Sequence, residues 1–125
     1  MATIASGSSS HAEGGCHLEY VDENGNIIHT TAAGFCSHAE GVSTQALGDW
    51  GAHAEGSGTI ASGDSSHAEG GSDATGNWSH AEGNGSIASG YAAHAEGYGT
   101  TAYGNSSHAE GDNTFTYGVG SHSEG

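Results

Sequence analysis

The tetrapeptide His-Ala-Glu-Gly occurs seven times in this chain of 125 residues, and His-Ser-Glu-Gly closes the chain at 122–125. The seven copies begin at residues 11, 38, 53, 67, 80, 94 and 108. A second motif of small residues ends in glycine and lies between the copies, at 4–7, 45–48, 60–63, 73–76, 87–90, 101–104 and 115–118. A repeat of about fourteen residues, with one insertion, therefore governs the chain.

A unit of about fourteen residues is too short for a pair of helices, but it holds two short strands and two tight turns, which form one coil of a β-solenoid. In the segment Ser66–Gly70, the small residues take one parity, and His67 and Glu69 take the other. Because alternate residues of a strand face opposite sides, we expect Ser66 and Ala68 to face a thin interior and His67 and Glu69 to face outward. The glycine after each strand allows a positive φ at the corner.

The composition limits the classes of function. The chain has no Lys or Arg and a net charge of -15, which opposes binding to nucleic acid or to anionic membranes. Large aliphatic residues and Phe are few, so the composition alone would suggest disorder, which the strict repeat opposes. There is no apolar run of about 20 residues to span a membrane, and we see no signal peptide at the N-terminus.

The alternation Ser-x-Ala-x-Gly, twice in each coil, resembles the head domains of trimeric autotransporter adhesins, the YadA-like heads. The motif SHAEG itself resembles repeats in surface and phage-tail proteins of Gram-positive bacteria. The resemblance implies a left-handed parallel β-roll of about eight coils of fourteen residues, all-β, occupying 1–125 as a single domain and packing as a homotrimer.

In the adhesin heads, two outward positions of each coil are usually aliphatic and line the trimer axis. Here the matching positions carry histidine and glutamate, so the resemblance implies rings of three histidines and rings of three glutamates along that axis. The histidines are His11, His38, His53, His67, His80, His94, His108 and His122. The glutamates are Glu13, Glu40, Glu55, Glu69, Glu82, Glu96, Glu110 and Glu124.

Three interpretations of these pairs compete. In the first, histidine donates to a glutamate of a neighbouring chain, the carboxylate favours a protonated or N–H donating imidazole, and the pairs specify the register of assembly. In the second, the histidines bind a divalent ion such as zinc or nickel, three of them per site from three chains, although no cofactor is required. The third is catalysis, which we do not expect, because an enzyme needs one distinctive pocket and not eight equal copies.

Residues 15–36 interrupt the repeat and hold many of the large apolar residues. We expect an inserted β-hairpin with a type I′ turn at Asn24-Gly25, in which Val21 pairs with Ile28 and Tyr20 with His29. Such a hairpin would cap the roll, hold a neighbouring chain or dock a partner. Cys16 and Cys36 bracket the insertion, and either a disulfide across its base or two buried free thiols fits the sequence.

Aromatic residues fall at expected corners, where they would stack on sugar rings or pack against one another as a ladder: Trp50, Trp78, Tyr91, Tyr98, Tyr103 and Tyr117. Five aspartates are expected in turns: Asp22, Asp49, Asp64, Asp73 and Asp112.

The sequence thus predicts a structural or adhesive module of an extracellular fibre or adhesin head, able to stack end to end into filaments and to bind a surface glycan or matrix ligand. The alternatives are a receptor-binding module of a phage tail fibre and a metal-binding structural roll. Either way, we expect the module on a cell surface or virion.

Overall fold

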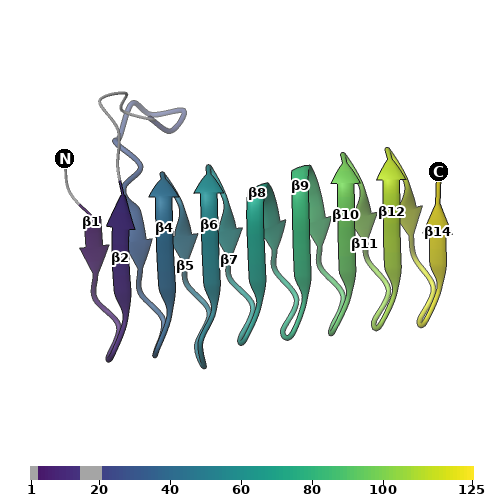
Figure 1. Ribbon diagram of the computed structural model, residues 1–125, viewed down its shortest axis with the longest axis horizontal. Coiled ribbons are helices and arrows are strands. Elements are labelled where there is room, and N and C mark those ends of the chain that lie inside the picture. Colours follow the sequence, from purple (N-terminus) through teal and green to yellow (C-terminus); the bar gives the residue numbers. More distant parts are fainter. Residues whose placement is uncertain (1–2, 15–20) are drawn as a thin grey trace.

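The computed structural model describes residues 3–14 and 21–125. Fourteen strands join in one sheet, and there is no helix among the described residues. All pairs between these strands are parallel, and equivalent residues of successive coils lie opposite one another, as His38 and His53 do. The coils therefore stack side by side along one axis (Figure 1), which confirms the predicted all-β parallel β-roll.

The strands form two faces. The first face holds the HAEG strands β2 (His11–Gly14), β4 (His38–Val42), β6 (His53–Ser57), β10 (His94–Tyr98), β12 (His108–Asp112) and β14 (His122–Glu124). The second face holds β1 (Thr3–Ala5), β3 (Thr30–Ala32), β5 (Gln45–Ala46), β7 (Ile60–Ala61), β11 (Thr101–Ala102) and β13 (Phe115–Thr116). Two longer strands, β8 (His67–Ala74) and β9 (His80–Ala88), contribute to both faces. They bend around the corner that leads from the first face to the second, at the top of Figure 1, which we call the upper corner; the opposite corner is the lower corner.

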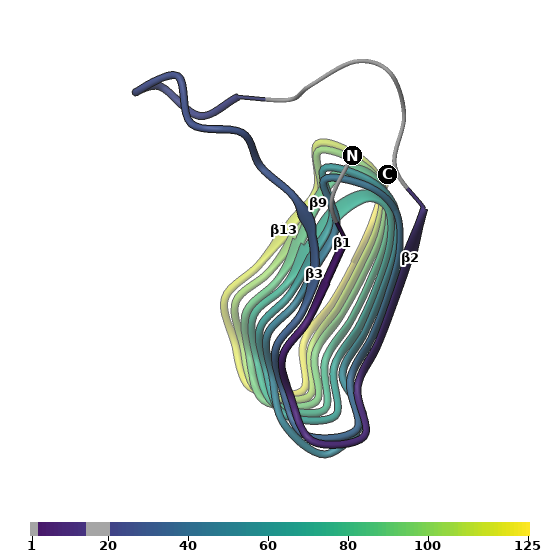
Figure 2. The same cartoon turned by 90° about the vertical axis from the view of Figure 1, so that its left-hand side faces the viewer.

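The roll is narrow, flat and left-handed. Seen along the axis, the two faces lie close together and are closed by tight corners (Figure 2). In Figure 2, which is seen from the N-terminal end, the chain descends along β1 on the left, crosses the lower corner to the right and rises along β2. It therefore turns counterclockwise as it recedes from the viewer along the stack of coils (Figure 1). This path is a left-handed turn, as expected.

The interior consists of alanine, serine and threonine. Fourteen alanines are no more than 1% exposed, among them Ala39, Ala68 and Ala95. Several of the buried hydroxyl groups bond to the backbone, as the Ser72 hydroxyl does, which lies 2.8 Å from the carbonyl oxygens of both Glu69 and Ala81. The predicted inward parity of the small residues is therefore correct.

Glycine keeps the coils in contact at the lower corner. A Cβ atom on Gly63 would collide with the carbonyl oxygen of Gly76 in the next coil. Because the obstacle is backbone, which cannot rotate away as a flexible side chain can, no larger residue fits without moving a coil. This close approach explains why the second motif of each unit ends in glycine.

Hydrogen bonds between coils hold the lower corner together. The Asp49 carboxylate accepts from the backbone N–H of Phe35 at 2.7 Å, and Asp64 accepts from the N–H of Asp49 at 3.1 Å. The predicted corner positions of these two aspartates are confirmed. The prediction is wrong for Asp73, which lies within β8 on the second face, and for Asp112, the last residue of β12. Burial raises the pKa of the Asp73 carboxyl group.

The roll resumes earlier than predicted after the insertion. Strand β3 lies inside the range 15–36, yet it pairs with β1 on one side and β5 on the other. The residues TAAG at 31–34 are thus a further copy of the second motif, and they belong to the roll.

The predicted hairpin register is also wrong. Val21 bridges Ile27 and not Ile28. The Asp22 carboxylate accepts from the backbone N–H groups of Asn24 and Asn26, at 2.9 Å each, and within residues 22–26 only Gly25 has a positive φ, of 81°. A type I′ turn needs positive φ at Asn24 as well, so the turn is of another type. The predicted partner Tyr20 lies outside the described residues.

The described part of the insertion does not cap the roll. Residues 21–29 project beyond the upper corner, away from the stack of coils, in both views (Figures 1 and 2). The end strand β1 is exposed along its length. The capping interpretation is therefore wrong for this part of the insertion.

Candidate functional site: the His–Glu face

The outward side of the HAEG strands, which we call the His–Glu face, carries all eight predicted histidines and all eight predicted glutamates. Because the strands are parallel and in register, each side chain lies above its equivalent at the spacing of neighbouring strands. From His38 to His122, successive imidazole rings stack with centroids 4.7 to 4.9 Å apart and within 7° of parallel. Only His11 tilts, by 57° to His38.

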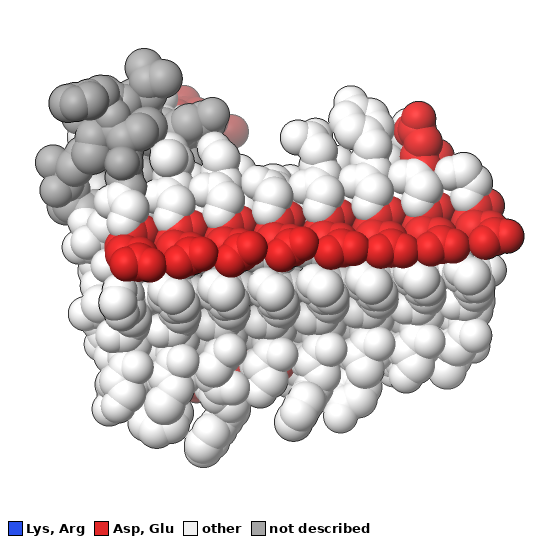
Figure 3. Space-filling model, viewed as in Figure 1, with Lys and Arg blue, Asp and Glu red and all other residues white. Residues whose placement is uncertain are grey.

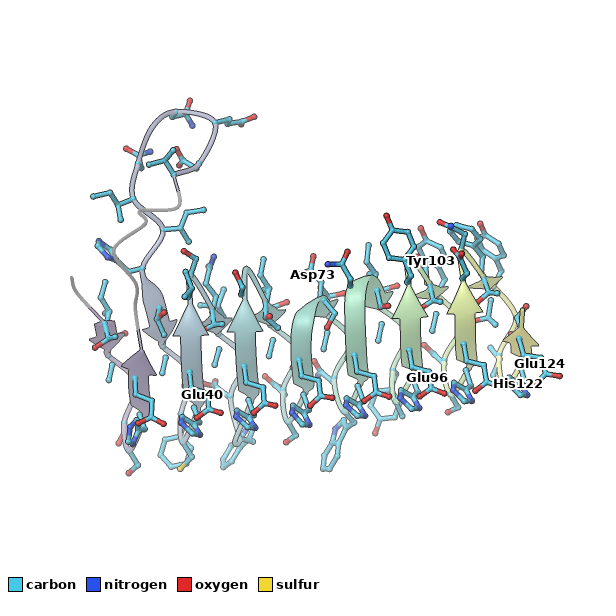
Figure 4. All side chains as sticks on the ribbon, turned by 45° about the horizontal axis from the view of Figure 1, so that its top comes forward. Glu40, Asp73, Glu96, Tyr103, His122 and Glu124 are labelled. Atoms are coloured by element: carbon cyan, nitrogen blue, oxygen red, sulfur yellow. The ribbon has the colours of Figure 1, made fainter. Side chains whose placement is uncertain are left out.

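The glutamates run beside the histidines as a second row. Their carboxylates form an unbroken acidic stripe along the roll (Figure 3). Glu40, Glu96 and Glu124, from β4, β10 and β14, lie on the same edge of the face (Figure 4). The predicted outward parity of histidine and glutamate is therefore correct, and the two residue types form two continuous ladders.

Three carboxylates, those of Glu13, Glu96 and Glu110, each lie near two imidazole groups. Within one coil, the histidine Nε2 and glutamate Oε2 atoms are 3.4 to 4.0 Å apart. Between coils, the Glu96 Oε1 atom is 3.4 Å from the Nε2 of His108. The sequence-based prediction did not include this contact between coils. Its signal is the spacing of about fourteen residues between most copies, because in-register coils place each His–Glu pair beside the next.

Six imidazole nitrogens on this face are buried without a hydrogen-bond partner in the described part of the chain. They are the Nε2 atoms of His38, His53, His67, His80, His94 and His108. The side chains themselves remain about one third exposed, as His53 is at 32%. A buried polar atom without a partner is destabilising, so these nitrogens favour the approach of a ligand or a partner.

Burial shifts the acid–base behaviour of the histidine ladder. The pKa values of His53, His80 and His94 are lowered, first by burial and then by the neighbouring imidazoles. The nearby carboxylates act in the opposite direction but are the smaller effect on these groups. Within one chain, the glutamates favour the protonated imidazole, but burial outweighs them at these three histidines. The predicted pairing with a glutamate of a neighbouring chain stays a prediction.

Neighbouring carboxyl groups share protons. Hydrogen bonds with Glu96 and Glu69 raise the pKa of Glu82 to about 7, with burial as a further cause. Hydrogen bonds from Glu82 and Glu110 lower the pKa of Glu96, and its bond with Glu96 raises the pKa of Glu110. Glu82 and Glu110 thus keep their protons to a higher pH than Glu96, whose carboxylate lies between them and accepts from both.

The face also places metal-binding atoms together. In the part of the chain that the structure describes, five groups of three residues have their ligand atoms within 4.8 Å of one another, close enough to hold a metal ion. The groups are His11/Glu13/His38, His53/Glu55/His67, Glu69/His80/Glu82, His94/Glu96/His108 and His108/Glu110/His122. The predicted site took one histidine from each of three chains, whereas these groups form within one chain from adjacent coils.

Four of the predicted aromatic residues lie away from this face. Trp50 and Trp78 are exposed at the lower corner, at 69% and 62%, whereas Tyr103 stacks on Tyr117 with ring centroids 5.1 Å apart. Cys36 is also exposed at this corner, so the prediction that its thiol is buried is wrong. Cys16 lies outside the described residues, and the disulfide stays a prediction.

No protein-family model, curated protein or solved structure matches this chain. Within residues 3–14 and 21–125, no helix is both long enough and apolar enough to cross a membrane. The resemblance to the adhesin heads and to the SHAEG repeats stays a prediction.

Proposed function

We propose that this chain is a non-enzymatic structural module, a segment of an extracellular fibre or the head of an adhesin, and that it assembles as a homotrimer through its His–Glu face. The observation that carries the proposal is a row of six buried imidazole nitrogens, on a straight, in-register face, that have no partner among residues 3–14 and 21–125. A neighbouring chain that presents the same face supplies carboxylate acceptors and imidazole donors at the same spacing.

The composition supports assembly through this face. With no Lys or Arg in the chain, histidine is the only side chain of the protein that can balance the charge of the glutamate ladder. Polar pairs buried between chains add little net stability, but they penalise a shifted register and so specify one arrangement. The interior of alanine, serine and threonine buries little apolar area, and a small core of this kind usually needs oligomerisation.

The repeated chemistry supports a structural role in place of catalysis. Eight coils carry the same pair of side chains, whereas an enzyme concentrates its functional groups in one distinctive pocket. Stacked coils also form continuous ladders of backbone hydrogen bonds, which suit a stiff fibre segment. End-to-end stacking into filaments and a place on a cell surface or virion follow from the same proposal.

The exposed aromatic rings support an adhesive role. Trp50 and Trp78 project from the same corner of coils that lie two apart, and indole rings stack on the apolar faces of sugars. A surface glycan or matrix ligand is therefore the partner we propose for this corner. A receptor-binding module of a phage tail fibre would use the same roll and the same corner.

A second candidate function is a structural roll that binds metal. The five groups of clustered ligands favour it, and imidazole with carboxylate suits zinc or nickel. In that case, dialysis against a chelator lowers the melting temperature and added zinc restores it. An unchanged melting temperature in both steps contradicts this candidate.

Two double variants test assembly through the His–Glu face. His80→Trp/His94→Trp places bulky rings on that face, and Thr75→Trp/Ser89→Trp places the same rings on the outward side of the second face. We expect the first variant to sediment as a monomer and the second to retain the trimer mass, with β-type circular dichroism in both. Loss of assembly only in the second variant contradicts the proposal.

A further inference from the structure

The ligand groups of the His–Glu face are arranged in pairs of coils. Each group with two histidines takes them from adjacent coils and takes its glutamate from the first of the two. In the first group, the Glu13 carboxylate lies 3.4 Å from the Nε2 of His11 and 3.8 Å from that of His38. One carboxylate therefore bridges two imidazole groups within a single chain.

These distances fit a small tetrahedral ion. Zinc bonds of about 2.0–2.2 Å place neighbouring ligand atoms of a tetrahedron about 3.4 Å apart. The His–Glu distances are already close to that value, whereas the two imidazole nitrogens must tilt toward each other from the stacked arrangement. His11 is tilted by 57° to His38, so the tilt is compatible with the roll.

The choice of ligand atoms selects the class of ion. Imidazole nitrogen binds zinc, nickel and related transition metals, whereas calcium and magnesium prefer sites made only of oxygen. Nε2 atoms are also the buried atoms of this face that lack partners in the described chain. A bound transition metal gives these nitrogens the partner that they lack.

The number of ions follows from the pairing. Each imidazole Nε2 binds one ion, so two groups that share a histidine cannot both be filled. The groups at His94/Glu96/His108 and His108/Glu110/His122 share His108, and the other three share no residue with these or with one another. One ion in each of the three and one in the shared pair makes four ions on the described part of each chain.

We propose that the His–Glu face binds zinc-class divalent ions within one chain, with one ion for every two coils. Where a group has two histidines, the ion is held by two imidazole groups and one carboxylate. The inference rests on the second candidate function above. It makes metal binding independent of trimerisation, and it predicts that the number of ions depends on which histidines are adjacent.

Equilibrium dialysis of the full chain against zinc, followed by elemental analysis, tests this. We expect four zinc ions per wild-type chain. His53→Gln/His67→Gln removes both histidines of one group and should leave three ions, whereas His38→Gln/His67→Gln breaks two groups and should leave two. Both variants lack two histidines, so only the adjacency differs. Circular dichroism checks that both remain folded.

A second matched pair guards against a variant that does not fold. His94→Gln/His108→Gln should leave three ions, and His80→Gln/His108→Gln should leave two. Equal counts within both pairs overturn the inference, because each histidine then binds alone or between chains. No zinc uptake by the wild type, or an equal uptake of calcium, overturns it together with the second candidate function. The chain mass in the same samples reports on the trimer separately, so a monomer with the adjacency-dependent counts retains this inference.

Discussion

At the residue scale, the glutamate ladder has the clearest consequence. Identical carboxyl groups lie side by side at the spacing of neighbouring strands, and the chain has no Lys or Arg to neutralise them. The raised pKa of Glu82 expresses this crowding, because neighbouring carboxyl groups favour its protonated form in the fold. Glu82 therefore stabilises the fold fully below its unfolded pKa of 4.5, and this contribution is lost as pH rises through about 7.

The variant Glu82→Gln tests this, since glutamine stays neutral at every pH. We expect it to match the wild type below pH 4.5 and to be more stable above pH 7, by about 1 kcal/mol after allowance for solvent screening. Urea unfolding at a series of pH values measures the difference. Glu13→Gln, on the exposed first strand of the ladder, is the control. A Glu82→Gln variant less stable than the wild type at pH 8 would mean that the ionised carboxylate is paired favourably.

The histidines respond to pH in the opposite direction. Because the folded pKa values of His53, His80 and His94 are lowered, the unfolded chain binds protons more readily. Their contribution to stability is present above the ordinary histidine value of 6.5 and is lost as pH falls below it. Glu82 therefore stabilises the fold most at acidic pH, whereas these three histidines stabilise it most above pH 6.5. No extreme of pH gives both contributions.

At the element scale, the close contact between coils makes the corner glycines indispensable. Gly63→Ala places a methyl group against the carbonyl oxygen of Gly76, and we expect it to lower the free energy of unfolding by about 3 kcal/mol or more. Gly71→Ala in the same coil is the matched control, because its Cβ would lie 3.4 Å from the nearest atom. That variant should change stability by less than about 1 kcal/mol. Equal losses in urea melts would show that the close approach at Gly63 is not what selects glycine.

The repeat predicted the strands because the small residues recur at the same positions in every coil, so that the period of the sequence is the length of one coil. Ala68 faces inward and His67 outward for the reason that any strand alternates. The prediction failed where a local side chain competes with this pattern. The Asp22 carboxylate binds the backbone N–H groups of Asn24 and Asn26, which sets a hairpin register that a two-residue turn signal does not contain.

The second boundary of the insertion was missed for a related reason. The segment TAAG at 31–34 comes directly after the irregular residues, which separate it from the HAEG copy at 11–14. Its place in the repeat becomes visible only in the structure, where β3 pairs with β1 and β5. Asp73 has a residue type common in turns, but it opens a copy of the second motif and is equivalent to Ile60 and Ile87, which lie in strands. Position in the repeat is the more reliable guide in this chain because the in-register stacking of the coils enforces it.

At the scale of the whole molecule, the roll has one polar face with unpartnered nitrogens and an interior too small to bury much apolar surface. The histidine and glutamate ladders were predictable from the sequence, but the contact from Glu96 to His108 of the next coil depends on the register of the strands. Assembly involves several chains. What supports a trimer within one chain is the set of buried imidazole nitrogens that lack a partner in its described part.

The mass of the wild-type chain in solution tests the central claim most directly, which is that the His–Glu face joins three copies of the roll. Static light scattering at neutral pH should give about 37 kDa, three times the chain mass of 12.3 kDa, with the same value across a range of protein concentrations. A mass of 12.3 kDa at all concentrations, with the β-type circular dichroism retained, would contradict the claim, because the ladders of histidine and glutamate would then face water in a monomer.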